Sequence, residues 1–101
     1  MLSFSDRVEV PSHVMVRLLE KESVFLNLET EDYYGLDETG TRMWQVVTAA
    51  PSIESAYVEL LNEFDVEAEL LRQNLSELLG RLVDIGLLRI HVADVETDPT
   101  V

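Results

Sequence analysis

Cysteine is absent from this 101-residue sequence, and histidine occurs only twice. Without thiols the chain has no disulfides, no thiolate nucleophile, no zinc finger and no iron–sulfur cluster. His13 and His91 stand near opposite ends of the chain, and neither has a ligand partner at helical spacing. The sequence therefore predicts no metal site.

Basic residues are also scarce. Lys and Arg number 7 against 20 Asp and Glu, which gives a formal net charge of −13. Proteins bind nucleic acid by neutralising phosphates with Lys and Arg, and anionic membranes attract basic segments. The charge balance therefore argues against nucleic acid and against a membrane as partners. It suits a cationic peptide or a basic patch on another protein.

Long hydrophobic runs are missing as well. No stretch approaches the run of about 18 apolar residues that a membrane helix needs. The N-terminus also lacks the basic segment and long apolar run that mark a signal peptide. We therefore expect a soluble, cytoplasmic protein.

No arrangement typical of catalysis is found in the sequence. The carboxylates fall on polar faces without an aligned base or nucleophile, and the serines have no His or Lys in a recognisable nucleophile context. There is no glycine-rich phosphate loop. We expect a protein that is not an enzyme and that holds no cofactor.

The composition that remains is that of one globular domain. Hydrophobic residues make up 47% and charged residues 27%, which is typical of a folded chain. Chains use roughly 100–200 residues per domain, so the length fits a single one. We place this domain at residues 1–93. Residues 94–101 have too little apolar content to pack and are predicted to be a disordered acidic tail.

Three short apolar segments in the first third of the chain are typical of β-strands. They are Val14–Leu19, Val24–Leu28 and Tyr33–Leu36, separated by charged breaks of four residues. Breaks of this length predict an antiparallel meander. Val8–Pro11 is a candidate edge segment upstream, because proline cannot donate to a ladder.

The apolar period then changes to that of helices. The expected helices run from about Asp37 to Pro51, from Ser52 to Phe64 and from Glu67 to Ile85. Asp37, Ser52 and Asp65 are suitable N-caps, and Gly86 suits the C-terminal end of the third helix. Leu87–Val92 looks like a final extended segment.

This order of elements predicts an α+β domain with segregated layers. A three-stranded antiparallel sheet followed by three helices is the layout of a winged helix-turn-helix. Most such domains read DNA, but the third helix contains Glu67, Glu69 and Glu77 against Arg72 and Arg81. A surface of this kind is poorly suited to phosphates.

One ordered set of residues resembles a known family. An aromatic pair at Tyr33-Tyr34, Leu36, Thr39-Gly40 and the apolar–tryptophan pair Met43-Trp44 stand in sequence, and Leu82–Leu88 later closes an apolar helix turn with Gly-Leu. Each motif alone is weak, but their joint order resembles the signature of the PqqD-like family over roughly residues 14–92.

The resemblance implies a recognition element for ribosomally made, modified peptides, which binds the leader region of a precursor peptide. A free-standing copy looks most like the stand-alone leader-binding protein of lasso-peptide biosynthesis, whose partners are a separate leader peptidase and possibly a cyclase. A peptide chaperone for a radical SAM maturase is the nearest alternative. An acidic protein that covers a basic DNA-binding surface and a degenerate winged-helix DNA regulator also stay open.

The family's binding mode implies that the leader adds as a strand to the third strand and lies against the third helix. A free strand edge offers backbone N–H and C=O groups to an extended peptide. The two tyrosines should face opposite sides of the strand, one in the core and one exposed. The glycine either lets a second backbone approach closely or forms a bulge, and the acidic pair would orient a basic leader end. The residues expected at this edge are Glu31, Asp32, Tyr33, Tyr34, Gly35 and Leu36.

The third helix supplies the expected opposite wall. With a step of about 100° per residue, Leu79 and Val83 lie on one shoulder of the inner apolar stripe, together with Arg72 and Ser76. The predicted wall is formed by Arg72, Leu75, Ser76, Leu79 and Val83. The alternative, which is commoner for a leucine on a helix, is that Leu79 and Val83 close the core.

Overall fold

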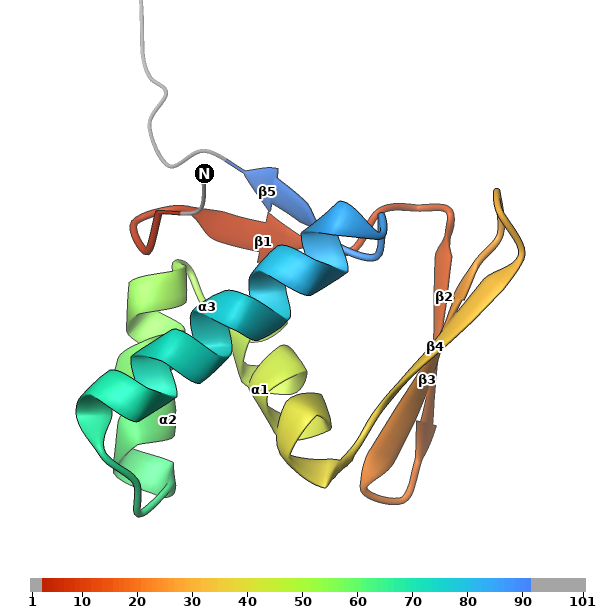
Figure 1. Ribbon diagram of the computed structural model, residues 1–101. Helices are drawn as coiled ribbons and strands as arrows, with labels where there is room; N and C mark the ends of the chain where they lie inside the picture. Colours follow the sequence, from red (N-terminus) through yellow and green to blue (C-terminus); the bar gives the residue numbers. More distant parts are fainter. Residues whose placement is uncertain (1–2, 92–101) are drawn as a thin grey trace, which may run out of the picture.

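The structure is a computed structural model that describes residues 3–91. Along the chain it contains β1 (Arg7–Glu9), β2 (Val14–Leu19), β3 (Glu22–Asn27), β4 (Asp32–Leu36), α1 (Glu38–Ala49), α2 (Ile53–Glu63), α3 (Ala68–Asp84) and β5 (Arg89–His91) (Figure 1). The predicted α+β order is confirmed. The tail predicted at 94–101 lies outside the described residues.

The three central strands form an antiparallel sheet of order β2-β3-β4, which we call the wing. Its register pairs Phe25 with Val16 on one side and with Tyr34 on the other. The predicted meander is therefore confirmed. The wing stands beside the helices, and α1 follows directly from β4 (Figure 1).

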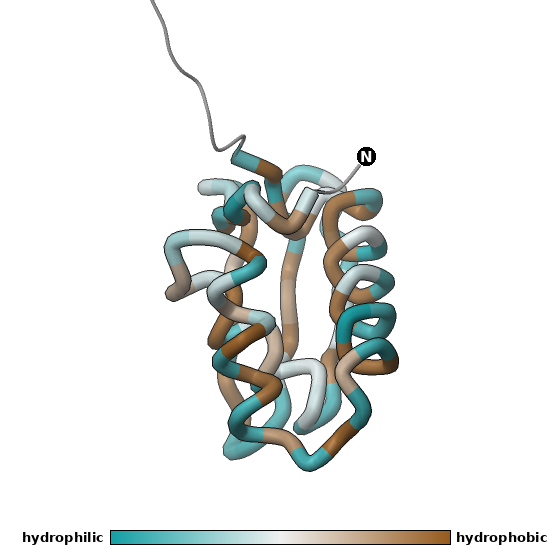
Figure 2. Tube along the Cα trace, turned by 90° about the vertical axis from the view of Figure 1, so that its left-hand side faces the viewer, coloured by the Kyte–Doolittle hydropathy of each residue, from teal (hydrophilic) through white to brown (hydrophobic). Residues whose placement is uncertain are grey.

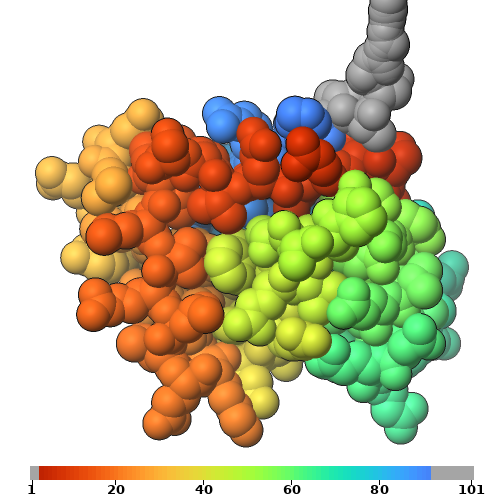
Figure 3. Space-filling model, turned by 180° about the vertical axis from the view of Figure 1, so that it is seen from behind, coloured from red at the N-terminus to blue at the C-terminus, as the bar shows by residue number. Residues whose placement is uncertain are grey.

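The segments at the two ends of the described chain pair with each other. Val8 of β1 lies opposite Ile90 of β5 in a separate two-stranded antiparallel sheet. Ahead of β1, the carbonyl of Phe4 accepts a hydrogen bond from Glu54 N–H at 2.7 Å. This bond satisfies one of the free N–H groups at the start of α2. Seen from behind, the N-terminal segment and β1 run across the upper edge of α1 and α2 (Figure 3).

The N-termini of α1 and α2 have the predicted caps, but the N-terminus of α3 does not. The Asp37 carboxylate accepts from Gly40 N–H at 2.9 Å, and the Ser52 hydroxyl accepts from Ser55 N–H at 3.1 Å. The N-cap of α3 is Glu67, whose side chain makes no capping hydrogen bond. Gly86 has a φ of 81° after α3, as a C-terminal glycine in the left-handed region should.

The core lies between the wing and the three helices. Its fully buried side chains include Phe25, Ile53, Leu60, Leu71, Leu75, Leu79 and Leu82. Hydrophobic positions recur along α3 between hydrophilic ones (Figure 2), which gives this helix one apolar side. The helix therefore packs this side inward and leaves two shoulders, one on each side of the buried stripe.

Two sets of polar contacts fix the wing against the helices. Thr41 of α1 donates its hydroxyl proton to the carbonyl oxygen of Leu36 at 3.3 Å, so the buried Ser23 hydroxyl donates to Thr41 Oγ1 at 2.7 Å. At the other end of the wing, His13 Nε2 donates to the carbonyl oxygen of Gly86 at 3.2 Å. The wing is thus held both at the start of α1 and just beyond the end of α3.

Candidate peptide-binding groove

Strand β4 has a free edge in the described part of the chain. It pairs with β3 on one side, and no described strand lies on the other. Leu28, directly after β3, donates its N–H to the carbonyl oxygen of His13, directly before β2, at 2.8 Å. Backbone groups alternate in direction along a strand, so every second residue of β3, counted back from Leu28, also directs its backbone groups toward β2. The residues between them, Phe25 among them, face β4.

The same alternation sets the direction of the backbone groups of β4. Tyr34 lies opposite Phe25, so its N–H and C=O face β3. Tyr33 and Gly35 direct theirs to the free edge. Two residues therefore present unpaired donors and acceptors to an extended chain lying alongside.

The side chains of β4 divide between the two faces of the wing as predicted. Tyr34 is half-buried and Leu36 is buried on the inner face, against the helices. Tyr33 points to the opposite face and is 72% exposed. The two aromatic side chains therefore lie on opposite faces of the wing.

A hollow lies between the inner side of β4 and the C-terminal end of α3. It has a volume of about 240 Å³ and is lined by Asn27, Asp32, Tyr33, Tyr34, Ile85 and Leu87. Of its apolar lining residues, Ile85 is 42% exposed, whereas Leu87 is buried. We call this hollow, together with the free edge of β4, the groove. An extended peptide on this edge would meet apolar side chains on one side and backbone groups on the other.

Arg81 stands on the shoulder of α3 that faces β4. Its Nη1 donates to the hydroxyl oxygen of Tyr34 at 3.3 Å, and this hydrogen bond raises the pKa of Arg81 further above its ordinary value. Among the described residues, no carboxylate forms an ion pair with Arg81, although Arg42, Arg72 and Arg89 each have one. Most of its five donors therefore stay available beside the groove.

Two residues of the predicted helix wall are buried in this structure. Leu79 is 0% exposed, and Leu75 is equally buried. Both belong to the centre of the core, so neither lines an open cleft in this structure. The alternative given for Leu79, that it closes the core, is the observed arrangement.

Arg72 and Ser76 lie on the shoulder of α3 away from β4. The guanidinium of Arg72 stacks over the ring of Phe4 at 3.9 Å and pairs with Glu54 at 3.3 Å. Ser76 lines a separate hollow with Phe4. Val83 shares this shoulder and packs partly buried against the core. The helical step correctly predicted that these residues share one side of α3. However, β4 lies beside the opposite shoulder, which carries Arg81.

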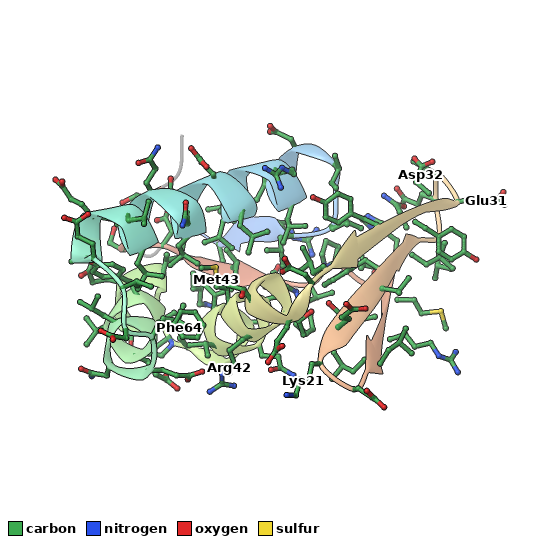
Figure 4. The ribbon with its side chains drawn as sticks, turned by 60° about the horizontal axis from the view of Figure 1, so that its bottom comes forward. Lys21, Glu31, Asp32, Arg42, Met43 and Phe64 are labelled. Atoms are coloured by element: carbon green, nitrogen blue, oxygen red, sulfur yellow. The ribbon has the colours of Figure 1, made fainter. Side chains whose placement is uncertain are left out.

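The remaining predicted residues lie on or beside β4. Glu31 and Asp32 are exposed at the end of the wing where β4 begins (Figure 4). Gly35 lies in a regular ladder opposite Val24, so the predicted bulge is absent. A Cβ on Gly35 would meet only the carbonyl oxygen of Ser23, at an ordinary 3.8 Å. Glycine is therefore not required there by the folded chain itself.

The sequence analysis missed the groove residues Asn27, Arg81, Ile85 and Leu87. Arg81 and Ile85 are four residues apart and so share one side of α3, a signal that was present in the sequence. The buried Asn27 side chain accepts hydrogen bonds from Glu29 N–H at 2.9 Å and from Thr30 N–H at 3.3 Å. It thereby shapes the turn that leads into β4.

Other kinds of site are not found in the described residues. Within residues 3–91, no three or more His, Asp or Glu side chains come together in a way that could hold a metal ion. In the same range, no helix is both long enough and apolar enough to cross a membrane.

The fold and the groove define a small α+β domain whose wing offers an open strand edge beside a helix. The sequence model of one family, described as coenzyme PQQ synthesis protein D (PqqD), matches residues 22–88. This match spans more than half of the chain, and the chain belongs to the PqqD family.

Two solved structures are similar to this chain. TbiB1 in complex with the TbiA(beta) leader peptide superposes with a TM-score of 0.72 at 26% identity, over 80% of this chain and 94% of that one. A lasso peptide synthetase B1 complexed with the leader peptide has a TM-score of 0.71 at 18% identity, over 82% of this chain and 98% of that one. The second likeness is one of fold alone. No curated protein sequence matches the chain.

Proposed function

We propose that this protein binds the leader region of a ribosomally synthesised precursor peptide in the groove. The observation that carries the proposal is the free edge of β4 beside the exposed shoulder of α3. Membership of the PqqD family supports it, as does the similarity to TbiB1, whose structure contains a leader peptide. In this proposal the chain is the recognition element of a lasso-peptide pathway.

The peptide adds to the wing as a fourth strand. Tyr33 and Gly35 exchange main-chain hydrogen bonds with it, which gives affinity that depends little on peptide sequence. Alternate peptide side chains point toward Ile85 and Leu87, and these give specificity. A bare α-carbon at Gly35 lets the second backbone approach closely.

Binding serves a reaction carried out by other proteins. The protein would hold the precursor near a separate leader peptidase, and possibly near a cyclase, by raising its local concentration and fixing its orientation. By itself it would leave the mass of the precursor unchanged. Incubation with precursor followed by mass spectrometry tests this point, and a cleaved or dehydrated product would contradict it.

The binding test is a titration of a fluorescein-labelled leader of the precursor encoded beside this chain, read by anisotropy. We expect a Kd in the low micromolar range or tighter, on the order of −8 kcal/mol. A DNA duplex of matched label at low salt is the control, because a winged-helix regulator would retain it. Duplex binding without leader binding would overturn the proposal.

Amide hydrogen exchange locates the binding site. Leader binding should slow exchange at the outward-facing N–H groups of Tyr33 and Gly35. The corresponding groups at the other edge of the sheet, Val16 and Leu18, should exchange as before. Slower exchange at Val16 and Leu18 alone would mean that the peptide binds at the edge of β2, and this result would contradict the proposal.

A further inference from the structure

The hollow of the groove has two walls that belong to different parts of the fold. One wall comes from the wing, namely from Asn27 at the end of β3 and from the first residues of β4. The other wall comes from Ile85 and Leu87. These two residues flank Gly86 in the segment 85–88 between α3 and β5, which we call the connector. The width of the groove is therefore the distance between the wing and the connector.

Few polar contacts join these two walls. Within the part of the chain that the structure describes, two hydrogen bonds link α3 or the connector to the wing or to the residue directly before it. One is the exposed bond from Arg81 to Tyr34. The other is the partly buried bond of 3.2 Å from His13 Nε2 to the carbonyl oxygen of Gly86. His13 does not line the hollow, so a bound peptide would leave its hydrogen bond intact.

His13 is also anchored to the wing. Its carbonyl oxygen accepts a hydrogen bond from Leu28 N–H at 2.8 Å, and its Nδ1 lies 3.9 Å from the carboxylate of Glu29. Both partners belong to the turn between β3 and β4, which leads into the free edge. The link from β1 to β2 passes beside the turn that follows α3 (Figure 1). A single residue thus connects the turn before β4 to the connector opposite.

The connector approaches the wing closely at Gly86. This glycine has a φ of 81°, and a Cβ on it would stand only 3.3 Å from Asn27 Nδ2. Glycine therefore suits this position both in conformation and in size. The Asn27 amide is itself fixed, because its oxygen accepts from Glu29 N–H and Thr30 N–H. The hydrogen bond from His13 thus holds the connector against a part of the wing that does not move aside easily.

From these contacts we propose that His13 is a positioning residue of the groove, which holds the connector at the distance from β4 that the leader peptide requires. It acts through the carbonyl group of Gly86 and touches no part of the peptide. Without this bond, only a fraction of the molecules would have correctly spaced walls, and the apparent leader affinity falls by that fraction. The effect on affinity rests on the proposed leader binding, whereas the effect on the spacing does not.

The spacing of the walls can be measured directly in the full chain without leader. Because the chain has no cysteine, spin labels can be attached at Thr30→Cys and Asp84→Cys, two exposed positions outside the lining of the hollow. Double electron–electron resonance then reports the distance between the turn before β4 and the end of α3. We expect a narrow distance distribution in the doubly labelled parent and a broader one when His13→Leu is added. The same narrow distribution in both proteins would overturn the proposal.

Anisotropy titrations with the labelled leader test the effect on affinity, after circular dichroism has shown that each variant is folded. His13→Leu removes the donor but keeps the bulk of the side chain, so leader affinity should fall by about 3–10-fold. His13→Gln retains an N–H donor and should stay within about twofold of the parent. The matched control is His91→Leu, because His91 pairs with Glu9 at 3.6 Å and does not line the hollow. A loss in His13→Gln as large as that in His13→Leu would overturn the proposal.

A double-mutant cycle separates positioning from a general loss of stability. If His13 acts through the connector, His13→Leu should cost less affinity in the Ile85→Ala background, where the wall that it positions is already shortened. We expect the two losses to fall short of their product by about twofold or more, and fully multiplicative losses would overturn the proposal. If the parent binds no leader while His13→Leu broadens the distance distribution, the proposed function fails and the positioning role stands. The two proposals therefore fail separately.

Discussion

Within residues 3–91 the wing has two strand edges that pair with no other strand, and the edges differ in what lies beside them. The free edge of β4, where Tyr33 and Gly35 direct their backbone groups outward, lies beside a hollow lined by Tyr33, Ile85 and Leu87. On β2 the outward groups belong to Val14, Val16 and Leu18, and Val14 N–H already donates to the carbonyl oxygen of Pro11 at 3.1 Å. Arg17 adds a charge to this strand, a common feature of edges that avoid pairing.

The difference teaches what makes an edge selective. Backbone groups alone would pair with any extended chain. A helix shoulder beside β4 adds side chains that distinguish one peptide from another, and the Arg81–Tyr34 hydrogen bond holds that shoulder near the strand. Four predictions test this difference, the role of each side of α3 and the limits of the groove.

The largest effect is expected from proline at the two edges. Gly35→Pro removes an outward N–H without removing a bond to β3, so we expect leader affinity to fall by about 100-fold, or about 2.7 kcal/mol. Val16→Pro removes the equivalent group on β2 and should leave affinity within about twofold. Anisotropy titrations measure both, and melting curves check folding. Equal losses of leader affinity in Gly35→Pro and Val16→Pro would show that the two edges do not differ in peptide binding.

The second effect separates the exposed shoulder of α3 from its buried stripe. Ile85→Ala shortens a side chain of the groove, so leader affinity should drop roughly 5–30-fold, or about 1–2 kcal/mol, with little change in melting temperature. Leu79→Ala empties core volume and should cost about 2–5 kcal/mol of unfolding free energy. Its affinity per folded molecule should stay the same. A selective loss of affinity in Leu79→Ala would restore the cleft that the sequence predicted.

A smaller effect compares two arginines on opposite shoulders. Arg81→Met removes donors beside the groove and the bond to Tyr34, so leader affinity should fall by about 3–10-fold. Arg72→Met changes packing over Phe4 on the other shoulder and should leave affinity unchanged. Isothermal titration calorimetry resolves this difference. If Arg72→Met binds the leader more weakly than Arg81→Met does, the leader lies against the other shoulder of α3.

The smallest effect lies away from both edges. Arg42 donates two hydrogen bonds of 2.8 Å to Glu63, which lowers the pKa of the Glu63 carboxyl. A depressed pKa contributes stability that is present above the unfolded value and is lost as pH falls through the folded value. Glu63→Gln should therefore lower the melting temperature slightly at neutral pH, and the difference should disappear in acid once the pH is below the folded pKa of Glu63. Leader affinity should not respond, and a change in it would mean that this pair reaches the groove.

The order and type of the elements were determined by the sequence itself. Alternating and helical apolar periods, short charged breaks and the caps Asp37 and Ser52 are local signals, so β2, β3, β4 and the three helices were predicted within a few residues. The aromatic pair of β4 was also divided correctly, because neighbouring strand residues must face opposite sides. The segment Leu87–Val92 was expected to be extended, but its pairing with β1 joins residues about 80 apart in the chain and had no local signal.

Only the tertiary structure decided which shoulder of α3 faces the wing. The helical step places Arg72, Ser76 and Val83 together on one side and Arg81 and Ile85 on another, and both sides flank the same buried leucines. The choice depends on the direction in which α3 crosses the sheet. That direction is set by long-range contacts, such as those of His13 with Gly86 and of Tyr34 with Arg81. The apolar periodicity of a sequence describes one helix at a time. It could therefore identify the buried stripe of α3, but not which element packs beside each of its two shoulders.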